Sequence, residues 1–294
     1  MATAFWNRIN TILLLLVLLA VIGALTSRAF GGPLDPTGPP TSTLPQLEPR
    51  GPIPPVGWDG VSAISINSAG SYFLTRNLGV PITIAAENVT FDLSGFTLTG
   101  AGNQTAITTA AGTKRHIIIR NGTLIGPGTS GGSAIYAREA GRSTFSDLQI
   151  SGWGVGLQLG TGDTVLRVES HDNTGPGIQV TQGSDFGGSI EDSNFSHNGG
   201  YGIVIFGNNV EVRDSVMDTN VNSGIAMLGS WNAVSGSRMV GNFYGAETEG
   251  NRNAVVSNHI DGNTSGTVFN SGAGNIIGPI SPAAGTNPAE NIGF

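Results

Sequence analysis

A motif that recurs about every 22 residues along the C-terminal half of the chain limits the folds that this sequence can adopt. The segments IEDSNFSHNGGYGIVI, VRDSVMDTNVNSGIAM and VSGSRMVGNFYGAETE begin at a constant spacing, at Ile190, Val212 and Val234. Apolar residues alternate with polar ones within each segment, which indicates short strands. A unit this short cannot bury its own apolar face, so consecutive units must stack. The sequence therefore predicts a solenoid in which each strand hydrogen-bonds with its copy in the next coil.

The apolar positions of the repeat predict columns of side chains in the interior. Three columns are expected: Val168, Ile190, Val212, Val234 and Val256; Ile178, Ile203 and Ile225; and Phe195, Met217 and Met239. Residues 61–280, at 22 residues per coil, correspond to roughly ten coils. The predicted fold is all-β, a single-stranded parallel β-helix with three short strands in each coil.

Two sets of asparagines follow the same period. The first set should end the third strand of each coil, and the second should lie in the turn before the second strand. The sets are Asn173, Asn198, Asn220, Asn242 and Asn263, and Asn209, Asn232, Asn253 and Asn275. Stacked amides can bond to one another from coil to coil, and asparagine tolerates the left-handed conformation of turns. Gly202 and Gly224 should fill bends where a Cβ would crowd the chain. We expect these residues to serve the scaffold.

The N-terminal residues 1–29 have the layout of an export signal. Arg8 precedes the uncharged segment Ile12–Leu25, and Ser27 and Ala29 supply small residues before a cleavage point. The apolar stretch is shorter than the roughly 20 residues of a spanning helix. A cleaved signal peptide is therefore expected, with a retained N-terminal membrane anchor as the alternative. Either reading predicts a protein that is secreted or held at the cell surface, and membrane contact only through this segment.

Three further regions follow the signal segment. Residues 30–57 form a proline-rich linker, because nine prolines between Pro33 and Pro55 favour an extended spacer. Residues 58–280 form the predicted β-helix. Residues 281–294 form a C-terminal tail or cap.

The charge balance limits the kinds of molecule that this protein is expected to bind. The chain carries 13 Lys and Arg against 20 Asp and Glu, a net charge of −7, and has no Cys. Nucleic-acid binding needs clustered basic residues, so no nucleic-acid partner is expected. The lack of Cys excludes disulfides and thiolate metal sites. A polyanionic sugar is an awkward ligand for such a surface unless a cation mediates the contact.

Several segments resemble a known family. GSYFLTRNL (Gly70–Leu78), ITIAAENVTFDLSGFTLTG (Ile82–Gly100) and the N-x-x-x-G-I pattern of the coils are similar to secreted bacterial proteins with right-handed parallel β-helix repeats, in the pectate-lyase-like superfamily. The resemblance covers roughly residues 31–280. It implies a right-handed helix with three parallel sheets. It implies activity only weakly, because that superfamily holds lyases, hydrolases, epimerases and members without known activity.

The sequence contains few motifs or residue clusters that are typical of catalysis or metal binding. The strings N-T-D, G-H-G and R-I-K, which are usual in lyases and hydrolases of this fold, do not occur, and neither does the Y-G-F-D-P-H string of mannuronan epimerases. The densest polar cluster offers His171 as a base, oriented by Asp172 or Glu169, with His197 on the next coil. Asp147, Asp192 and Asp214 recur near one corner, where stacked acids can bind Ca²⁺ or simply bond turn amides. No metal and no other cofactor is the preferred expectation.

Aromatic residues offer the other candidate site. Trp153, Tyr201, Trp231 and Tyr244 fall at predicted bends, where exposed rings can stack on sugar faces or cover coil edges. We therefore predict an exported β-helix that binds polysaccharide or a cell-surface protein, or serves as a structural element. The alternative is a polysaccharide lyase or C5-epimerase with a divergent site. The oligomeric state stays open.

Overall fold

A computed structural model describes residues 50–110, 112, 114–128, 131–160, 162–181, 187–278, 280–281 and 291–292. All regular structure in these residues is β-strand. Consequently, no described segment forms a helix of the length and apolarity that a membrane crossing requires. The predicted signal segment 1–29 lies outside the described residues, as does most of the predicted linker.

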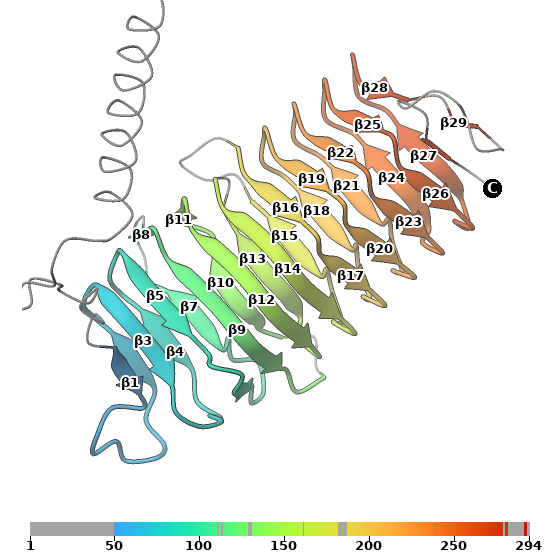
Figure 1. Cartoon of the computed structure of the whole chain (residues 1–294). Coiled ribbons are helices and arrows are strands. Elements are labelled where there is room, and N and C mark those ends of the chain that lie inside the picture. The colour runs from blue at the N-terminus through green and yellow to red at the C-terminus, as the bar shows by residue number, and fades with distance from the viewer. Residues whose placement is uncertain are drawn as a thin grey trace, which may run out of the picture. The chain divides into compact units, whose positions relative to one another are not determined.

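One sheet of ten parallel strands runs along the whole solenoid and contributes one strand to each coil (Figure 1). Its strands are β2 (Ile64–Ile66), β4 (Ile82–Ile84), β7 (Ile107–Thr109), β10 (Ser133–Ala137), β13 (Val155–Leu159), β15 (Ile178–Val180), β18 (Ile203–Ile205), β21 (Ile225–Met227), β24 (Tyr244–Thr248) and β27 (Gly266–Asn270). The ten coils agree with the predicted number.

The other two faces of the coils form one bent sheet of 18 strands. Its strands are β1 (Gly51–Ile53), β3 (Gly70–Leu74), β5 (Val89–Asp92), β6 (Thr97–Thr99), β9 (Ile118–Ile125), β12 (Thr144–Ser151), β14 (Thr164–His171), β16 (Ser189–Glu191), β17 (Asn194–Ser196), β19 (Glu211–Arg213), β20 (Val216–Asp218), β22 (Ala233–Ser235), β23 (Arg238–Val240), β25 (Ala254–Val256), β26 (His259–Asp261), β28 (Ile276–Ile277), β29 (Ile280–Ser281) and β30 (Asn291–Ile292). A small pair, β8 (Lys114–Arg115) and β11 (Ala140–Gly141), is separate. All strand pairs are parallel, as expected for a β-helix.

The second and third strands of a coil are separated by a residue in the left-handed conformation. In the coil that contains β18, β19 and β20, this residue is Asp214, with a φ of 49°. In β12 and β14 the two strands merge into eight residues, and Asp147 and Arg167 make the same bend with φ of 55° and 51°. Three strand segments per coil are thus confirmed.

The interior columns confirm stacking and correct its register at both ends. Ile178, Ile203 and Ile225 align, and so do Phe195, Met217 and Met239. The valine column is instead Val165, Ile190, Val212, Val234 and Val255. Val168 and Val256 were placed wrongly, because the first coil of this column is longer than the common repeat and the last is shorter. Val168 is buried one bend further along its strand, and Val256 pairs with Ser235.

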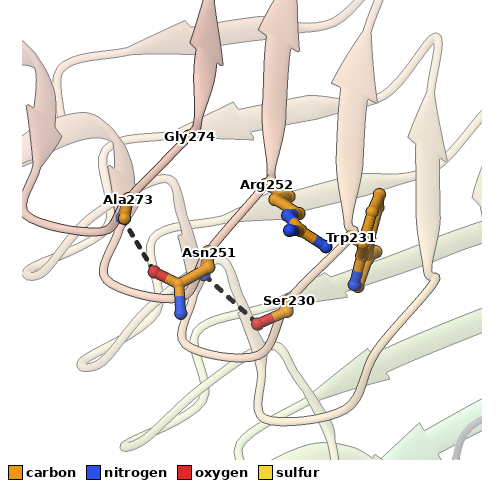
Figure 2. A pocket seen from close by; sticks show the side chains of 6 residues that line it. All are labelled: Ser230, Trp231, Asn251, Arg252, Ala273 and Gly274. Carbon is orange, nitrogen blue, oxygen red and sulfur yellow. Dashed lines mark hydrogen bonds between the residues drawn. The ribbon is translucent and has the colours of Figure 1, made fainter.

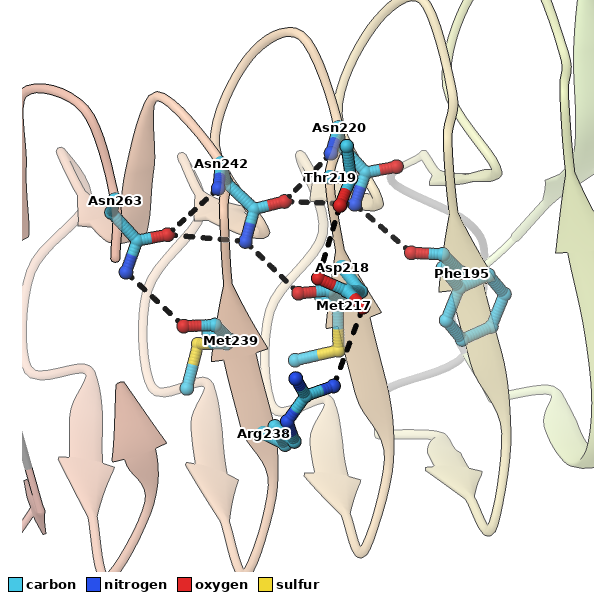
Figure 3. A network of polar contacts seen from close by, with 9 residues as sticks. All are labelled: Phe195, Met217, Asp218, Thr219, Asn220, Arg238, Met239, Asn242 and Asn263. Atoms are coloured by element: carbon cyan, nitrogen blue, oxygen red, sulfur yellow. Dashed lines mark hydrogen bonds and ion pairs between the residues drawn. The ribbon is translucent and has the colours of Figure 1, made fainter. Parts of the chain in front are cut away.

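The first asparagine set forms the predicted ladder (Figure 3). Each side-chain amide donates to the next side-chain oxygen, with N–O distances from 2.9 Å between Asn173 and Asn198 to 3.3 Å between Asn242 and Asn263. The same oxygens accept backbone N–H groups, as in the bond of 3.0 Å from the Asn198 N–H to Asn220. The ladder satisfies polar groups inside the bend, which would otherwise be buried without partners.

The second asparagine set is a ladder of a different kind and has three members. Asn232, Asn253 and Asn275 accept backbone N–H groups from the preceding coil, for example 2.9 Å from the Val210 N–H to the Asn232 oxygen. Asn209, which the sequence grouped with them, is the residue before Val210 and has a φ of 58°. All four asparagines lie in the turn before the second strand, as predicted, but Asn209 aligns with Trp231 and not with Asn232.

The β-helix begins before residue 58, where the sequence predicted the boundary between linker and β-helix. β1 pairs with β3 in register Gly51 to Tyr72, so the β-helix includes residues that were expected to belong to the linker. At the other end, β30 pairs in parallel with β26 and β29, so part of the predicted tail continues the sheet.

Candidate functional site

The outward row of the ten-stranded sheet aligns one side chain from each of its ten strands. Strand register places one residue from each coil in it: Ser65, Thr83, Thr108, Tyr136, Gln158, Gln179, Val204, Ala226, Glu247 and Phe269. Successive members are separated by the spacing of paired strands, about 4.8 Å. Its exposed and partly buried members therefore present side chains at a regular step along the solenoid.

The first six members of this row are neutral and have groups that can donate or accept hydrogen bonds. They carry hydroxyl, phenol or amide groups, and Tyr136, Gln158 and Gln179 are partly buried. Arg138 lies just beyond this row, and its Nε donates to the Thr181 hydroxyl at 3.3 Å. The next two members of the row, Val204 and Ala226, are buried.

Near its C-terminal end the row reaches a cluster of acidic and hydroxyl groups. Ser223 donates its hydroxyl to Glu247 at 2.9 Å. Burial raises the pKa of Glu247, and a hydrogen bond with Glu249 and the charge of that neighbour raise it further. Burial also raises the pKa of Tyr201, with the charges of Glu247 and Glu249 adding to the effect. The Ser223 hydrogen bond lowers the pKa of Glu247, but the net direction is upward, so the folded protein holds this proton more tightly than the unfolded chain does.

The raised pKa of Glu247 leads to a pH-dependent stability difference. The folded state binds this proton more tightly than the unfolded state, so the stability from Glu247 is present below its ordinary pKa of 4.5 and is lost as pH rises through the raised value. Glu247→Gln should therefore gain melting temperature relative to the wild type as pH rises from 4 toward 8. Glu87→Gln, which removes an exposed carboxylate elsewhere, is the control for the loss of one negative charge. A difference between Glu247→Gln and wild type that is constant with pH would contradict this assignment.

The four aromatic residues that the sequence predicted as binding residues differ in their exposure to solvent. Tyr244 is partly buried, and its ring lies 4.9 Å from Phe243 and 5.4 Å from Phe269, so three rings gather at the C-terminal end of the ten-stranded sheet. Tyr201 is partly buried beside the acidic cluster.

Trp153 is fully buried, and its indole N–H donates to the Leu124 carbonyl at 3.2 Å. A surface role for Trp153 was therefore wrong, because its ring fills the interior.

Trp231 is exposed and lies in an open pocket with Arg252, whose guanidinium carbon is 4.6 Å from the centre of the indole ring (Figure 2). It therefore meets the expectation of an exposed ring.

The histidine cluster is only partly assembled. His171 and Asp172 are hydrogen-bonded through Nδ1 and Oδ2 at 2.7 Å, as predicted. Glu169 lies two residues before His171 on β14, and His197 follows the next coil's strand, at the same bend as Asp172. Asp172 and His197 have φ of 52° and 54°, so this bend uses residues that tolerate the left-handed region. The side chain of Asp172 is 67% exposed, so the pair lies at an open corner.

The three aspartates proposed for Ca²⁺ lie in one column of left-handed residues, but they are not consecutive. Arg167 separates Asp147 from Asp192 and binds Asp147 through its Nε at 2.7 Å. This bond lowers the pKa of Asp147. Within the described ranges, no group of three His, Asp or Glu side chains is arranged to hold a metal ion. The column, which continues to Asp214, instead reflects the backbone demand for Asp at a bend.

Sequence reasoning missed Ser223, Glu247 and Glu249 as a group. The neighbours of Glu247 in the row, Ala226 and Phe269, are apolar, so the row itself gives no sign of an acidic cluster. The signal that would have found the cluster is the Gly-apolar register: Tyr201, Ser223 and Tyr244 each precede the recurring glycine, and they lie beside the outward row.

Comparison with known proteins supports the fold. Residues 82–237 match the family model described as a right handed beta helix region, which covers more than half of the chain. No curated protein matches the sequence significantly.

Solved structures with a similar fold include two epimerases and a viral protein. A mutant of the periplasmic alginate epimerase AlgG has a TM-score of 0.55 and 10% identity, covering 74% of this chain and 70% of that one. The A-module of the mannuronan C-5 epimerase AlgE4 from Azotobacter vinelandii has a TM-score of 0.53 and 12% identity, covering 76% and 91%. ORF18 of Geobacillus virus E2 has a TM-score of 0.51 and 11% identity, covering 74% of this chain and 54% of the viral one. At these identities the likeness concerns the fold alone.

Proposed function

This chain belongs to the right-handed β-helix family, and from that premise we propose that it is an exported protein that binds polysaccharide along its ten-stranded sheet. The observation that carries the proposal is the outward row of this sheet. Six neutral hydrogen-bonding side chains at a regular step suit an extended polymer whose repeating units each offer hydroxyl groups. The predicted signal segment and the periplasmic location of one structural neighbour support export.

A binding role fits the chemistry of the row better than catalysis does. Threonine, tyrosine and glutamine supply donors and acceptors that match sugar hydroxyls without a net charge. The first six members include no His, Lys, Arg, Asp or Glu side chain. A structural protein of the cell surface would bind polysaccharide through the same row of side chains.

The binding proposal predicts a specific loss. Gln158→Ala combined with Gln179→Ala should weaken the binding of a recognised glycan by about tenfold, because each side chain contributes roughly one net hydrogen bond to the ligand. A glycan array with the full chain identifies the ligand, and calorimetry with that glycan measures the change. The control is Gln149→Ala, since Gln149 is an exposed glutamine on β12 of the other sheet. Equal affinity of the double variant and the wild type would refute binding along this row.

A second function, a uronate lyase or C5-epimerase, is favoured by one observation. Tyr201, Glu247 and Glu249 lie together on the ten-stranded sheet, and a protonated Glu247 is able to donate a hydrogen bond to a sugar carboxylate. Such a bond would stabilise the negative charge that develops on the carboxylate when a base removes the proton from the neighbouring ring carbon. However, the raised pKa of Tyr201 makes the phenol a proton donor rather than a base, so this function ranks second.

Turnover separates the two functions. Polymannuronate and polygalacturonate would be incubated with the chain, with and without Ca²⁺, and followed by NMR for epimerised residues and by ultraviolet absorbance for unsaturated products. Turnover that is lost in Tyr201→Phe and retained in His171→Ala would establish the enzyme at this cluster. Loss only in His171→Ala would instead place the reaction at the histidine corner.

A further inference from the structure

Three successive coils form an open pocket at the turn that follows the ten-stranded sheet. Its lining residues are Ser230, Trp231, Asn251, Arg252, Ala273 and Gly274, and its volume is about 490 Å³ (Figure 2). This pocket lies at the turn between β21 and β22 and its copies in the next two coils. It is separate from the outward row, and the proposed function does not use it.

The backbone at this turn favours glycine or asparagine, yet it carries a tryptophan and an arginine. Five successive coils place Gly187, Asn209, Trp231, Arg252 and Gly274 at the same position, with φ between 58° and 89°. Among the 16 non-glycine residues with positive φ in the described part of the chain, Trp231 is the only apolar one. A bulky residue in this region is strained by about 1 kcal/mol or more, and such exceptions concentrate at functional sites.

The guanidinium of Arg252 is oriented but not neutralised by a described carboxylate. Several other arginines form ion pairs, for example Arg167 with Asp147 at 2.7 Å and Arg213 with Glu191 at 2.9 Å. Arg252 instead lies over the Trp231 ring, with 4.6 Å between its guanidinium carbon and the ring centre. This contact restrains the guanidinium without using its N–H donors in an ion pair, and their fork geometry suits a planar carboxylate.

The polar groups around the guanidinium also present donors. The Ser230 hydroxyl oxygen accepts the Asn251 N–H at 3.2 Å, which leaves its own hydrogen free to donate. The Asn251 side-chain oxygen accepts the Ala273 N–H at 2.8 Å, so the amide NH₂ of Asn251 is the group that remains for a ligand. The pocket thus combines three kinds of donor with an aromatic ring that is 53% exposed.

We propose that this pocket binds a sugar acid, with Arg252 holding the carboxylate and Trp231 contacting the sugar ring. Ser230 and Asn251 donate hydrogen bonds to the same ligand. The ligand carries a single carboxylate, such as a terminal uronic acid on a neutral glycan, because the net charge of −7 repels polyanions. The pocket therefore recognises one acidic unit.

The test compares two disaccharides that differ in one group. A β-1,4-linked disaccharide ending in glucuronate and the same disaccharide ending in glucose are titrated into the full chain and followed by NMR. The glucuronate form should bind more tightly than the glucose form, and Arg252→Gln should weaken its binding by about tenfold, because a hydrogen-bonded charge pair is lost. Arg252→Lys should restore only part of the affinity, since lysine lacks the planar fork. Trp231→Gly should weaken both disaccharides, and glycine suits the backbone at this position.

Matched variants distinguish this pocket from a general charge effect. Arg76 stacks on Trp58 with a separation of 5.2 Å, so Arg76→Gln removes an equivalent arginine elsewhere and should leave binding unchanged. Any of three outcomes would overturn the proposal: no binding of the glucuronate form, equal affinity in Arg252→Gln, or an equal loss in Arg76→Gln. Tighter binding of a sulfated disaccharide would overturn the assignment to a carboxylate. Gln158→Ala should not affect this titration, so it is independent of glycan binding along the sheet.

Discussion

Asn220→Ala should destabilise the protein by about 3 kcal/mol or more, because it interrupts the buried amide ladder at its centre. The Asn220 oxygen accepts the backbone N–H and the side-chain amide of Asn198, both at 3.0 Å. Its amide donates to the Phe195 carbonyl at 2.9 Å and to the Asn242 oxygen at 3.0 Å (Figure 3). Alanine would leave buried donors and acceptors of three residues without these bonds, and each such group costs about 1–3 kcal/mol.

Urea unfolding of the full chain measures the change, and Asn222→Ala is the matched control. Asn222 is exposed, two residues along the same bend, and it bonds to the neighbouring coil through its backbone N–H. Its replacement should change the free energy of unfolding by less than about 0.5 kcal/mol. Similar losses in the two variants would mean that the ladder contributes nothing beyond ordinary surface asparagines.

Gly229→Ala should be comparably or more damaging, through a steric conflict. A Cβ at this position would lie 1.8 Å from the carbonyl oxygen of Gly207 in the preceding coil. The same conflict recurs one coil later, where a Cβ on Gly250 would lie 1.8 Å from the Gly229 oxygen. The obstacle is backbone, so relief requires separation of two coils rather than rotation of a side chain. We expect a loss of about 3 kcal/mol or more, beyond the usual range for overpacking.

The melting temperature of Gly229→Ala should be compared with that of Gly79→Ala. A Cβ at Gly79 meets only the Thr99 hydroxyl, at an ordinary 3.4 Å, and its backbone is not in the left-handed region. Gly79→Ala should therefore keep the wild-type melting temperature or raise it slightly, because alanine restricts the unfolded chain. Retention of wild-type stability by Gly229→Ala would show that the coils are not held as closely as described.

The stacking could be predicted from the repeat because every coil contains the whole pattern, in its length and in its alternation of apolar and polar residues. Its errors arose where the length of a coil departs from the common repeat. Val168 and Val256 kept the numerical spacing, but one longer and one shorter coil moved other side chains, Val165 and Val255, into the column. Hydrogen bonds between coils determine the register, and a spacing in the sequence cannot show an inserted or deleted residue in a turn.

The candidate sites were harder to predict than the fold, for a related reason. Trp153 and Trp231 both fall in turns with neighbouring glycines, yet one ring is buried and the other is exposed. Glu247 appeared isolated in the sequence because Ser223 and Tyr201 come from other coils. Side chains that meet across coils are about 20–45 positions apart, and only the register brings them together.

An all-β solenoid, its approximate coil number and the structural role of the first asparagine set were predictable from the repeat, since each follows from a short pattern that every coil contains. The side of a bend on which each aromatic ring lies, and the meeting of side chains from different coils, became known only from the folded chain. Those outcomes depend on contacts between coils, where one residue more or less in a turn shifts every following neighbour.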